Sequence, residues 1–250
     1  MPTTTPASRR YDRLDALRGV AIVWMTAYHF CFDLNHFGWI RQNFLYDPFW
    51  TTQRTAIVSL FLFCAGVGQA VAHAQGQGWP RFWRRWAQIA GCALLVTAGS
   101  ALMFPGSFIY FGVLHGIAVM LILVRLTANW GAWLWVAGAI AIVLPQFALP
   151  VHVHFGNLGI LNRPVLNWIG FVSMKPVTQD YVPLLPWLGV MWWGMAAGQA
   201  AHRHARALLQ GPIPRVFSPL AWLGRWSLSW YMLHQPVLMG ALMLVQLARR

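Results

Sequence analysis

The sequence predicts an all-α fold: a polytopic transmembrane helical bundle of about seven spans, with one re-entrant or interfacial segment. The first observation that predicts a membrane protein is the composition. Of the 250 residues, 58% are hydrophobic and only 9% are charged, whereas soluble domains carry about 25% charged residues. The second observation is a series of apolar stretches that approach the ~20 residues needed to span a bilayer. They lie near 16-35, 55-73, 86-104, 108-126, 130-149, 184-201 and 226-247.

The first stretch carries a line of ionisable residues, Asp15, Arg18, His29 and Asp33. At ~100° per residue, these four and Thr26 fall within an arc of roughly 80° on a helix. Charged groups at membrane depth normally face a bundle interior or a water-filled cavity. This polar stripe, as we call the five residues, therefore predicts a functional site on one face of the helix.

Spacing within the stripe suggests pairs. Asp15 lies three residues before Arg18 and Asp33 four residues after His29, and helical side chains meet at both spacings. Asp33 would orient the His29 ring and raise its basicity, as a general base requires. Arg18 and His29 would lie about 16 Å apart on the same face. The alternatives are an ion pair that anchors the helix at the interface and a histidine packed between helices.

The middle stretches follow one another closely. Breaks at Pro105–Gly106 and Thr127–Asn129 predict antiparallel hairpins. His115 is a further candidate catalytic residue, or else an interhelical hydrogen-bond donor; it stands between Gly112 and Gly116, a small-residue face that lets another helix approach. Before the third stretch, arginines alternate with aromatic residues. They would grip phosphates or anchor the chain at the interface; the residues are Arg81, Arg84, Arg85, Trp79, Phe82, Trp83 and Trp86.

The last third is less regular. The apolar run Gly159–Phe171 is interrupted by Asn162–Pro164 and Asn167, which predicts the interfacial or re-entrant segment. Asp180 precedes the sixth stretch, and we expect either a site residue or the cap of that helix. His234, in the last stretch, shares a face with Ser227 and Tyr231 and would serve the donor site or form an interhelical hydrogen bond.

Basic residues predict the orientation. With a cytoplasmic N-terminal tail over 1–12 and a transmembrane domain over 13–250, the inner side holds Arg9, Arg10, Arg13, Arg81, Arg84, Arg85, Arg125, Arg203, Arg206, Arg215 and Arg225. The outer loops hold Arg41, Arg54, Arg163 and Lys175, and Arg249 and Arg250 would also lie outside. Because these arginines are spread over short loops, we expect membrane lipids as partners and no nucleic acid. A homo-oligomer is compatible with the sequence.

Other chemistries have little support. Glutamate is absent, so carboxylate chemistry depends on five aspartates, and the three cysteines lie in apolar segments. The histidine pairs His152/His154 and His202/His204 lack acidic or cysteine neighbours in the sequence, so no metal is predicted. Arg9–Arg10 resembles an export signal, but no cleavage site follows, which favours an uncleaved anchor.

Four motifs together resemble bacterial relatives of heparan-alpha-glucosaminide N-acetyltransferase. They are Arg13–Val23 followed by His29, Phe108–Ala118, Tyr181–Gly189 and Leu223–Pro236. The opening Leu-Arg-Gly with a histidine eleven residues beyond the arginine also resembles the wider transmembrane acyltransferase superfamily. In that superfamily the positions of Arg18 and His29 are functional.

The resemblance implies acyl transfer from a cytoplasmic thioester, usually acetyl-CoA, to a hydroxyl or amine of a glycan or other small acceptor on the far side of the bacterial inner membrane. One departure is that the lysosomal enzyme has a catalytic histidine before its second core helix, whereas Asp47–Arg54 contains none. Two other hypotheses remain open. The stripe would line the pathway of a small-solute transporter, or His29, His115 and His234 would be axial ligands of a b-type haem carrier.

Overall fold

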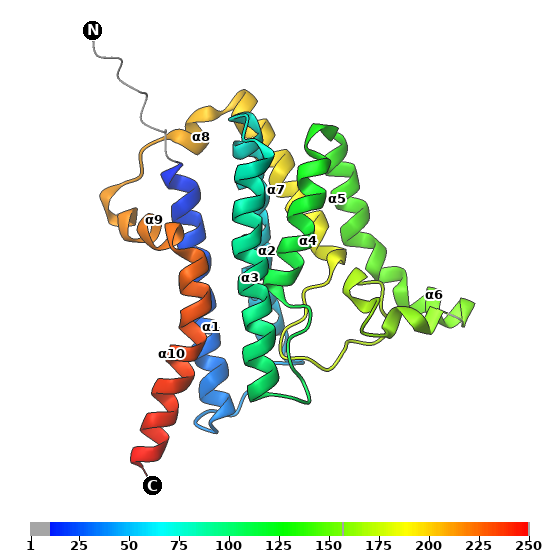
Figure 1. Cartoon of the computed structure of the whole chain (residues 1–250), viewed down its shortest axis with the longest axis vertical. Helices are drawn as coiled ribbons and strands as arrows, with labels where there is room; N and C mark the ends of the chain where they lie inside the picture. The colour runs from blue at the N-terminus through cyan, green and yellow to red at the C-terminus, as the bar shows by residue number, and fades with distance from the viewer. Residues whose placement is uncertain (1–10, 157, 250) are drawn as a thin grey trace. The chain divides into compact units, whose positions relative to one another are not determined.

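The computed structural model describes residues 11–156 and 158–249, and it divides the chain into two compact units. The first unit joins the two ends of the chain, 1–60 and 200–250, and the second holds 61–199. Arg9, Arg10 and Arg250 lie outside the described residues, as does most of the predicted tail. Throughout the described residues the regular structure is helical, so the predicted all-α class is confirmed (Figure 1).

The first unit is built on two long helices, α1 (Asp12–His36) and α10 (Ser227–Ala248). Their polar contacts rise together in residue number, from Thr26 with Trp230 to Asp33 with Gln235, so the two helices are parallel (Figure 1). The short helices α8 (Arg206–Gln210) and α9 (Ser218–Arg225) precede α10. Parallel first and last helices require an odd number of membrane crossings in total, which agrees with seven.

Glycine allows α9 to lie directly against α1. A Cβ on Gly19 would stand 2.0 Å from the backbone oxygen of Leu220, and one on Gly224 would stand 1.8 Å from that of Asp15. Only residues without side chains permit backbones this close. The glycine of the Leu-Arg-Gly motif therefore fixes the crossing of α1 and α9, beside the first residues of the polar stripe.

The boundary between the units falls within α2 (Pro48–Ala74) and near the end of α7 (Leu184–His204). The second unit contains the later part of α2, most of α7, and the helices α3 (Trp79–Met103), α4 (Val113–Leu126), α5 (Trp133–Val143) and α6 (Ala148–Phe155). Its core includes Leu62, Met120, Leu134, Met191 and Met195, all fully buried. Gly66 and Gly194 bring α2 and α7 into backbone contact. A 3₁₀ turn, η2 (Leu144–Phe147), joins α5 to α6.

The seven predicted stretches all coincide with helices, with changes in length. The fourth is shorter, since α4 begins at Val113 after an extended segment, and the fifth continues through η2 and α6 to Phe155. The segment before α7 contains only the 3₁₀ turns η3 (Leu158–Asn162) and η4 (Asn167–Ile169) among its described residues.

Within residues 11–156 and 158–249, four helical segments are long and apolar enough to cross a membrane by themselves: Pro48–Ala74, Trp79–Met103, Trp133–Phe155 and Ser227–Ala248. The helix Val113–Leu126 is apolar but shorter. Helix α1 is outside this set, and its sequence carries the ionisable residues of the polar stripe.

Candidate functional site

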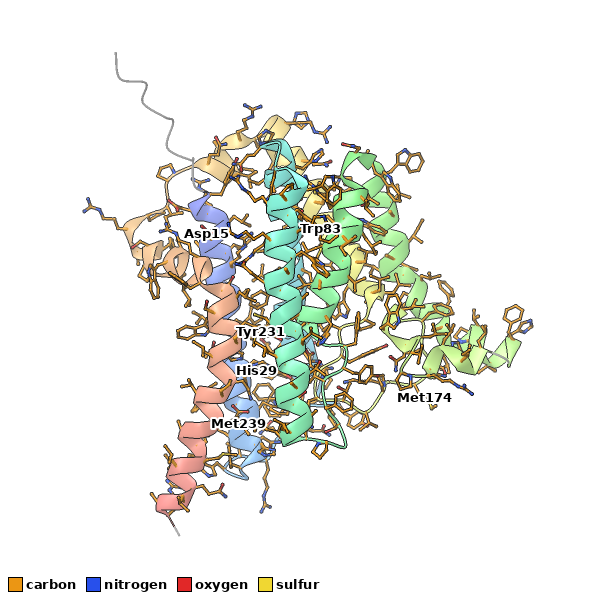
Figure 2. All side chains as sticks on the ribbon, viewed as in Figure 1. Asp15, His29, Trp83, Met174, Tyr231 and Met239 are labelled. Atoms are coloured by element: carbon orange, nitrogen blue, oxygen red, sulfur yellow. The ribbon has the colours of Figure 1, made fainter. Side chains whose placement is uncertain are left out.

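The polar stripe lies on the side of α1 that packs against α9 and α10 in the first unit. Asp33 is fully buried there, and the other four residues are partly exposed. Thr26 Oγ1 accepts a hydrogen bond from Trp230 Nε1 at 2.9 Å, one turn before His29 reaches His234. Figure 2 shows Asp15 and His29 on α1, with Tyr231 and Met239 on α10. The second half of the stripe, Thr26, His29 and Asp33, therefore lies in the contact between the first and last long helices.

His29 and His234 form a hydrogen-bonded pair at the centre of this contact. His29 Nδ1 and His234 Nε2 are 2.7 Å apart, with ring planes 11° from parallel. The other nitrogen of His234, Nδ1, lies 2.8 Å from the carbonyl oxygen of Tyr231 and 3.2 Å from that of Trp230. His234 is buried, with 6% of its surface exposed. Among the described residues, the hydrogen bonding of His29 uses Nδ1 alone.

Asp33 contacts the neighbour of His234 instead of His29. Its Oδ1 accepts a hydrogen bond from Gln235 Nε2 at 2.6 Å, and the residue is fully buried. Among the described residues, Asp33 Oδ2 and Gln235 Oε1 are buried without hydrogen-bond partners. We expected Asp33 to contact and orient the His29 ring. In the structure His234 contacts that ring instead, because α10 packs against the same face of α1.

The Asp15–Arg18 pair belongs to a larger charged cluster. Arg18 Nη1 lies 3.0 Å from Asp15 Oδ1, as the spacing predicted. Arg225, at the end of α9, approaches Asp15 Oδ2 at 3.8 Å and Asp12 Oδ1 at 2.8 Å. Asp15 therefore stands between two guanidinium groups. The cluster ties α9 to the start of α1.

His115 lies in the second unit, where both of its ring nitrogens are used. Its Nδ1 accepts from the backbone N–H of Gly112 at 3.3 Å, and its Nε2 contacts Thr97 Oγ1 at 2.9 Å. The Thr97 hydroxyl in turn contacts the carbonyl oxygen of Ile109 at 2.8 Å. This arrangement joins the start of α4 to α3, so the structure places His115 in a structural network.

Asp180 caps a helix, although a different one from the helix that follows it. Its Oδ2 accepts from the backbone N–H of Val113, the first residue of α4, at 2.7 Å. A Cβ on Gly112 would stand 2.3 Å from that oxygen, so glycine is needed there. The expectation that Asp180 caps the helix it precedes is thus replaced by a cap of α4, since the loop before α7 folds back on the loop before α4.

Those two loops are held together by a polar network. Val182 N–H donates to the carbonyl oxygen of Phe111 at 3.2 Å. The Tyr181 hydroxyl donates to the backbone oxygen of Asn167 at 2.6 Å, and Asn167 Nδ2 donates to the Tyr110 hydroxyl at 2.7 Å. Burial raises the pKa of the Tyr181 hydroxyl, and Tyr110 adds to the rise, so Tyr181 stays a neutral donor. The second and third motifs therefore meet here.

The arginines Arg81, Arg84 and Arg85 are exposed at the start of α3. Trp79 and Trp83 stack there at 5.9 Å between ring centroids. Arg125, from the end of α4, lies over the Trp79 ring at 5.5 Å and donates to the backbone oxygen of Gln77. The basic end of the second unit is thus opposite the end that carries Asp180 and His115.

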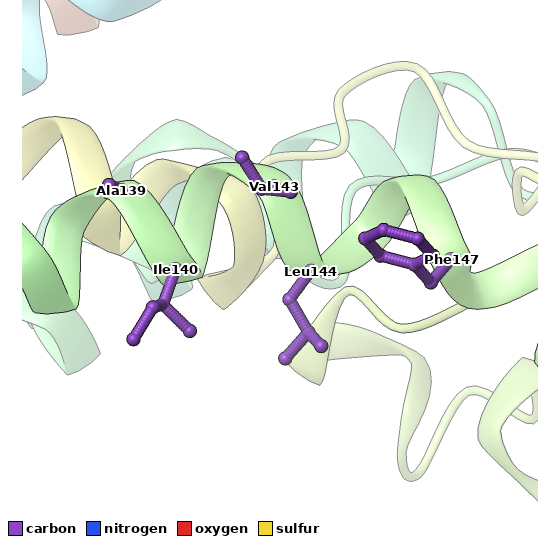
Figure 3. Close-up of a pocket in the computed structure, with 5 residues that line it drawn as sticks. All are labelled: Ala139, Ile140, Val143, Leu144 and Phe147. Atoms are coloured by element: carbon purple, nitrogen blue, oxygen red, sulfur yellow. The ribbon is translucent and has the colours of Figure 1, made fainter.

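Two other features do not resemble a reaction centre. Among the described residues, no group of three or more His, Cys, Asp or Glu side chains is placed to hold a metal ion. The hollow of about 340 Å³ on α5 and η2 is lined by five apolar residues and offers no polar group (Figure 3); these are Ala139, Ile140, Val143, Leu144 and Phe147. The haem hypothesis meets a geometric obstacle. A direct hydrogen bond between His29 and His234 occupies the lone pair that one of them would give to iron.

Sequence reasoning did not single out Gln235, and it gave Arg225 only a role in orientation; in the structure these two residues contact the two ends of the stripe. Both stand in the Leu223–Pro236 motif, whose polar residues at helical spacing are the signal that could have identified them. Their partners lie about 200 positions away in the sequence, so pairing them required the packing of α9 and α10.

The fold and composition define an integral membrane protein, with paired histidines and a buried carboxylate between its first and last long helices. The family model described as heparan-alpha-glucosaminide N-acetyltransferase, catalytic, matches residues 10–236. The chain belongs to this family, which makes it a membrane enzyme of the acetyltransferase type and confirms the resemblance of the motifs. Comparisons with curated proteins and with solved structures find no match.

Proposed function

We propose that this protein transfers an acetyl group from cytoplasmic acetyl-CoA to a hydroxyl or amine of a glycan or other small acceptor on the outer side of a bacterial inner membrane. The observation that carries the proposal is the contact of His29 with His234 at 2.7 Å, inside the membrane-spanning bundle. A histidine held in this way is suited to act as a general base, and general bases contribute roughly 10²–10⁴-fold to a rate.

The reaction balances around His29. The acceptor hydroxyl or amine gives a proton to His29, and its oxygen or nitrogen forms a bond to the acetyl carbonyl carbon. The carbon–sulfur bond of the thioester breaks, and the departing thiolate takes the proton from His29. The products are an acetyl ester or amide and the free thiol of CoA. In the alternative route, His29 itself carries the acetyl group between two such steps.

The donor would enter from the end of the stripe that carries Arg18. Eleven residues of helix separate Arg18 from His29, or about 16 Å, which an extended pantetheine arm can bridge. Phosphates would remain at the cytoplasmic face, where Arg18 supplies a guanidinium group, which pairs well with phosphate. The acceptor would approach from the Asp33 end.

Radiolabelled acetyl-CoA and purified protein in nanodiscs test the proposal. We expect label to appear in simple amine or hydroxyl acceptors such as glucosamine and glucose. Rapid acid or base quenching without acceptor distinguishes the routes, because only the two-step route leaves label on the protein. Acetyl-CoA that neither binds nor reacts, together with solute uptake into liposomes, would contradict the proposal in favour of the transporter.

A further inference from the structure

We propose that His234 is a positioning residue that decides which nitrogen of His29 is the base. This inference rests on the proposed function, but its physical content is a tautomer that can be measured without any activity. The relevant atoms are the four ring nitrogens of His29 and His234 and the two carbonyl oxygens of α10 beside them.

The carbonyls fix the proton on His234. Nδ1 of His234 lies 2.8 Å from the Tyr231 oxygen and 3.2 Å from the Trp230 oxygen. Carbonyl oxygens only accept hydrogen bonds, so Nδ1 must carry a proton. In a neutral ring one nitrogen is a donor and the other an acceptor. Nε2 of His234 therefore presents a lone pair.

That lone pair fixes the proton on His29. Nδ1 of His29 lies 2.7 Å from Nε2 of His234, and two lone pairs at this distance would repel each other. His29 must therefore be protonated at Nδ1, and its Nε2 keeps the lone pair. The opposite assignment would need an unprotonated Nδ1 on His234 facing two carbonyl oxygens, with no donor between them.

The arrangement also stabilises the charged form of His29 during the reaction. When Nε2 takes a proton from the acceptor, the Nδ1–H bond to His234 becomes a charge-assisted hydrogen bond, which is roughly twice as strong as a neutral one. His234 is buried at 6% exposure, so water does not compete strongly for this contact. By contrast, both nitrogens of His115 are engaged, at Gly112 and Thr97.

Two substitutions of His234 distinguish its role as a hydrogen-bond acceptor for His29 from its role in packing. In His234→Gln, the side-chain oxygen can accept from Nδ1 of His29, because the amide reaches nearly as far as Nε2. In His234→Leu, volume is kept and the acceptor is lost. Trp24→Phe is the matched control, since it removes a different side-chain hydrogen bond of α1, the one to Gln53.

We expect His234→Leu to lose about 10²-fold or more in turnover, the scale of a general base, while His234→Gln and Trp24→Phe stay within about tenfold of the wild type. Full activity of His234→Leu would overturn the inference. So would a His234→Gln variant that is as inactive as the Leu variant while Trp24→Phe keeps its activity.

Nitrogen-15 NMR of histidine-labelled protein in nanodiscs shows which ring nitrogen of His29 carries the proton. A purely structural role of His234 would not determine this protonation site. Difference spectra of the His29→Gln and His234→Gln variants assign the two rings. We expect both rings protonated at Nδ1 in the wild type, and His29 protonated mainly at Nε2 in His234→Leu. A wild-type His29 with its proton on Nε2 would overturn the inference, even if acetyl transfer is observed. If no transfer is observed, the proposed function fails while the tautomer is still decided.

Discussion

His29 and His115 show that the environment of a histidine, more than its presence in a motif, indicates chemistry. Both stand in the motifs that resemble the acetyltransferase family, and both lie on apolar helices. His115 gives its two nitrogens to Gly112 and Thr97, whereas the hydrogen bonding of His29 involves only Nδ1 among the described residues. A ring with an uncommitted nitrogen can exchange a proton with a substrate.

Substitution of His29 by alanine should abolish acetyl transfer and leave the protein in the membrane. The expected loss is about 10²-fold or more, because a general base is removed. His36→Ala, at the end of the same helix, is the control for altered insertion of α1. Turnover of both variants should be compared at equal amounts of membrane protein, and a wild-type rate for His29→Ala would exclude the role.

The charged cluster at the start of α1 should behave as a coupled unit. Asp15 contacts Arg18 at 3.0 Å and faces Arg225 at 3.8 Å. Side chains in one network show non-additive effects, so Asp15→Asn and Arg18→Gln should together cost less than the sum of the single variants. The difference should be about 1 kcal/mol or less, the usual value for partly exposed pairs.

Thermal unfolding of the four proteins in a double-mutant cycle measures this coupling. A second cycle, with Arg225→Gln alone and in the Asp15→Asn background, measures the coupling between Asp15 and Arg225. Strictly additive losses would mean that Asp15 and Arg18 contribute independently, in which case their contact at the helix surface has no energetic importance.

At this scale the sequence predicted which polar residues of α1 share one face of the helix, because helical periodicity is a local property. It did not predict that Asp33 meets Gln235, or that His234 takes the place expected of Asp33. Those facts depend on the register of α10 against α1, which is set by packing between segments 202 residues apart. Local spacing carries no information about such a register.

Among the helices, the crossing of α1 and α9 depends on glycine. Gly19→Ala and Gly224→Ala should each destabilise the protein, because the new methyl group would meet backbone atoms of Leu220 and Asp15 at 2.0 and 1.8 Å. Backbone cannot move aside as a flexible side chain can. Overpacking of this kind typically costs about 1–3 kcal/mol.

Gly91→Ala and Gly99→Ala are matched controls in α3, where an added Cβ meets nothing within 4 Å. Alanine is the better helix former by about 1 kcal/mol, so these controls should be neutral or slightly stabilising. Melting temperatures in the same detergent compare the two pairs. Equal effects at all four glycines would show that the close crossing is unimportant.

Asp180 should contribute to α4 through its cap. Asp180→Ala removes the acceptor for the Val113 N–H and should cost about 0.5–2 kcal/mol, the range for an N-terminal capping residue. Asp180→Asn retains an acceptor and should cost less. Unfolding midpoints distinguish the variants. An alanine variant as stable as the asparagine variant would indicate that the carboxylate serves another purpose.

The positions of the long helices could be read from apolar runs, but helix ends and loop contacts could not. The start of α4 moved to Val113 because residues 107–111 pair with the loop at 178–182. If Asp180 was a cap, we expected it to cap the helix that it precedes. It caps α4 instead, because its loop folds against the loop before α4, and such a contact between loops cannot be read from the sequence.

For the whole molecule, the predicted orientation places the two ends of α3 on opposite sides of the membrane. Ala74 lies just before the basic start of α3, and Val177 lies in the loop that pairs with residues after its end. Both residues are exposed. Cysteines placed at these positions, after replacement of Cys31, Cys64 and Cys92, should react with an impermeant maleimide from opposite faces. Ala74→Cys should react from the cytoplasm.

Inverted and right-side-out vesicles provide the two arms of that measurement, with permeabilised vesicles as the control for reactivity. Labelling of both positions from one face would contradict the seven-span arrangement and, with it, transfer across the membrane. Labelling from opposite faces but with the sides exchanged would keep the spans and reverse the direction proposed for the acetyl group.

The pairing of His29 with His234, 205 positions apart, has a consequence for biosynthesis. During translation α1 is made first, but its partner histidine becomes available only when the final helix has left the ribosome. Until then His29 has an unfixed tautomer and Asp33 lacks its glutamine. On the proposed mechanism, a nascent or prematurely terminated chain that ends before α10 would therefore be inert, because it lacks the histidine that fixes the proton on His29.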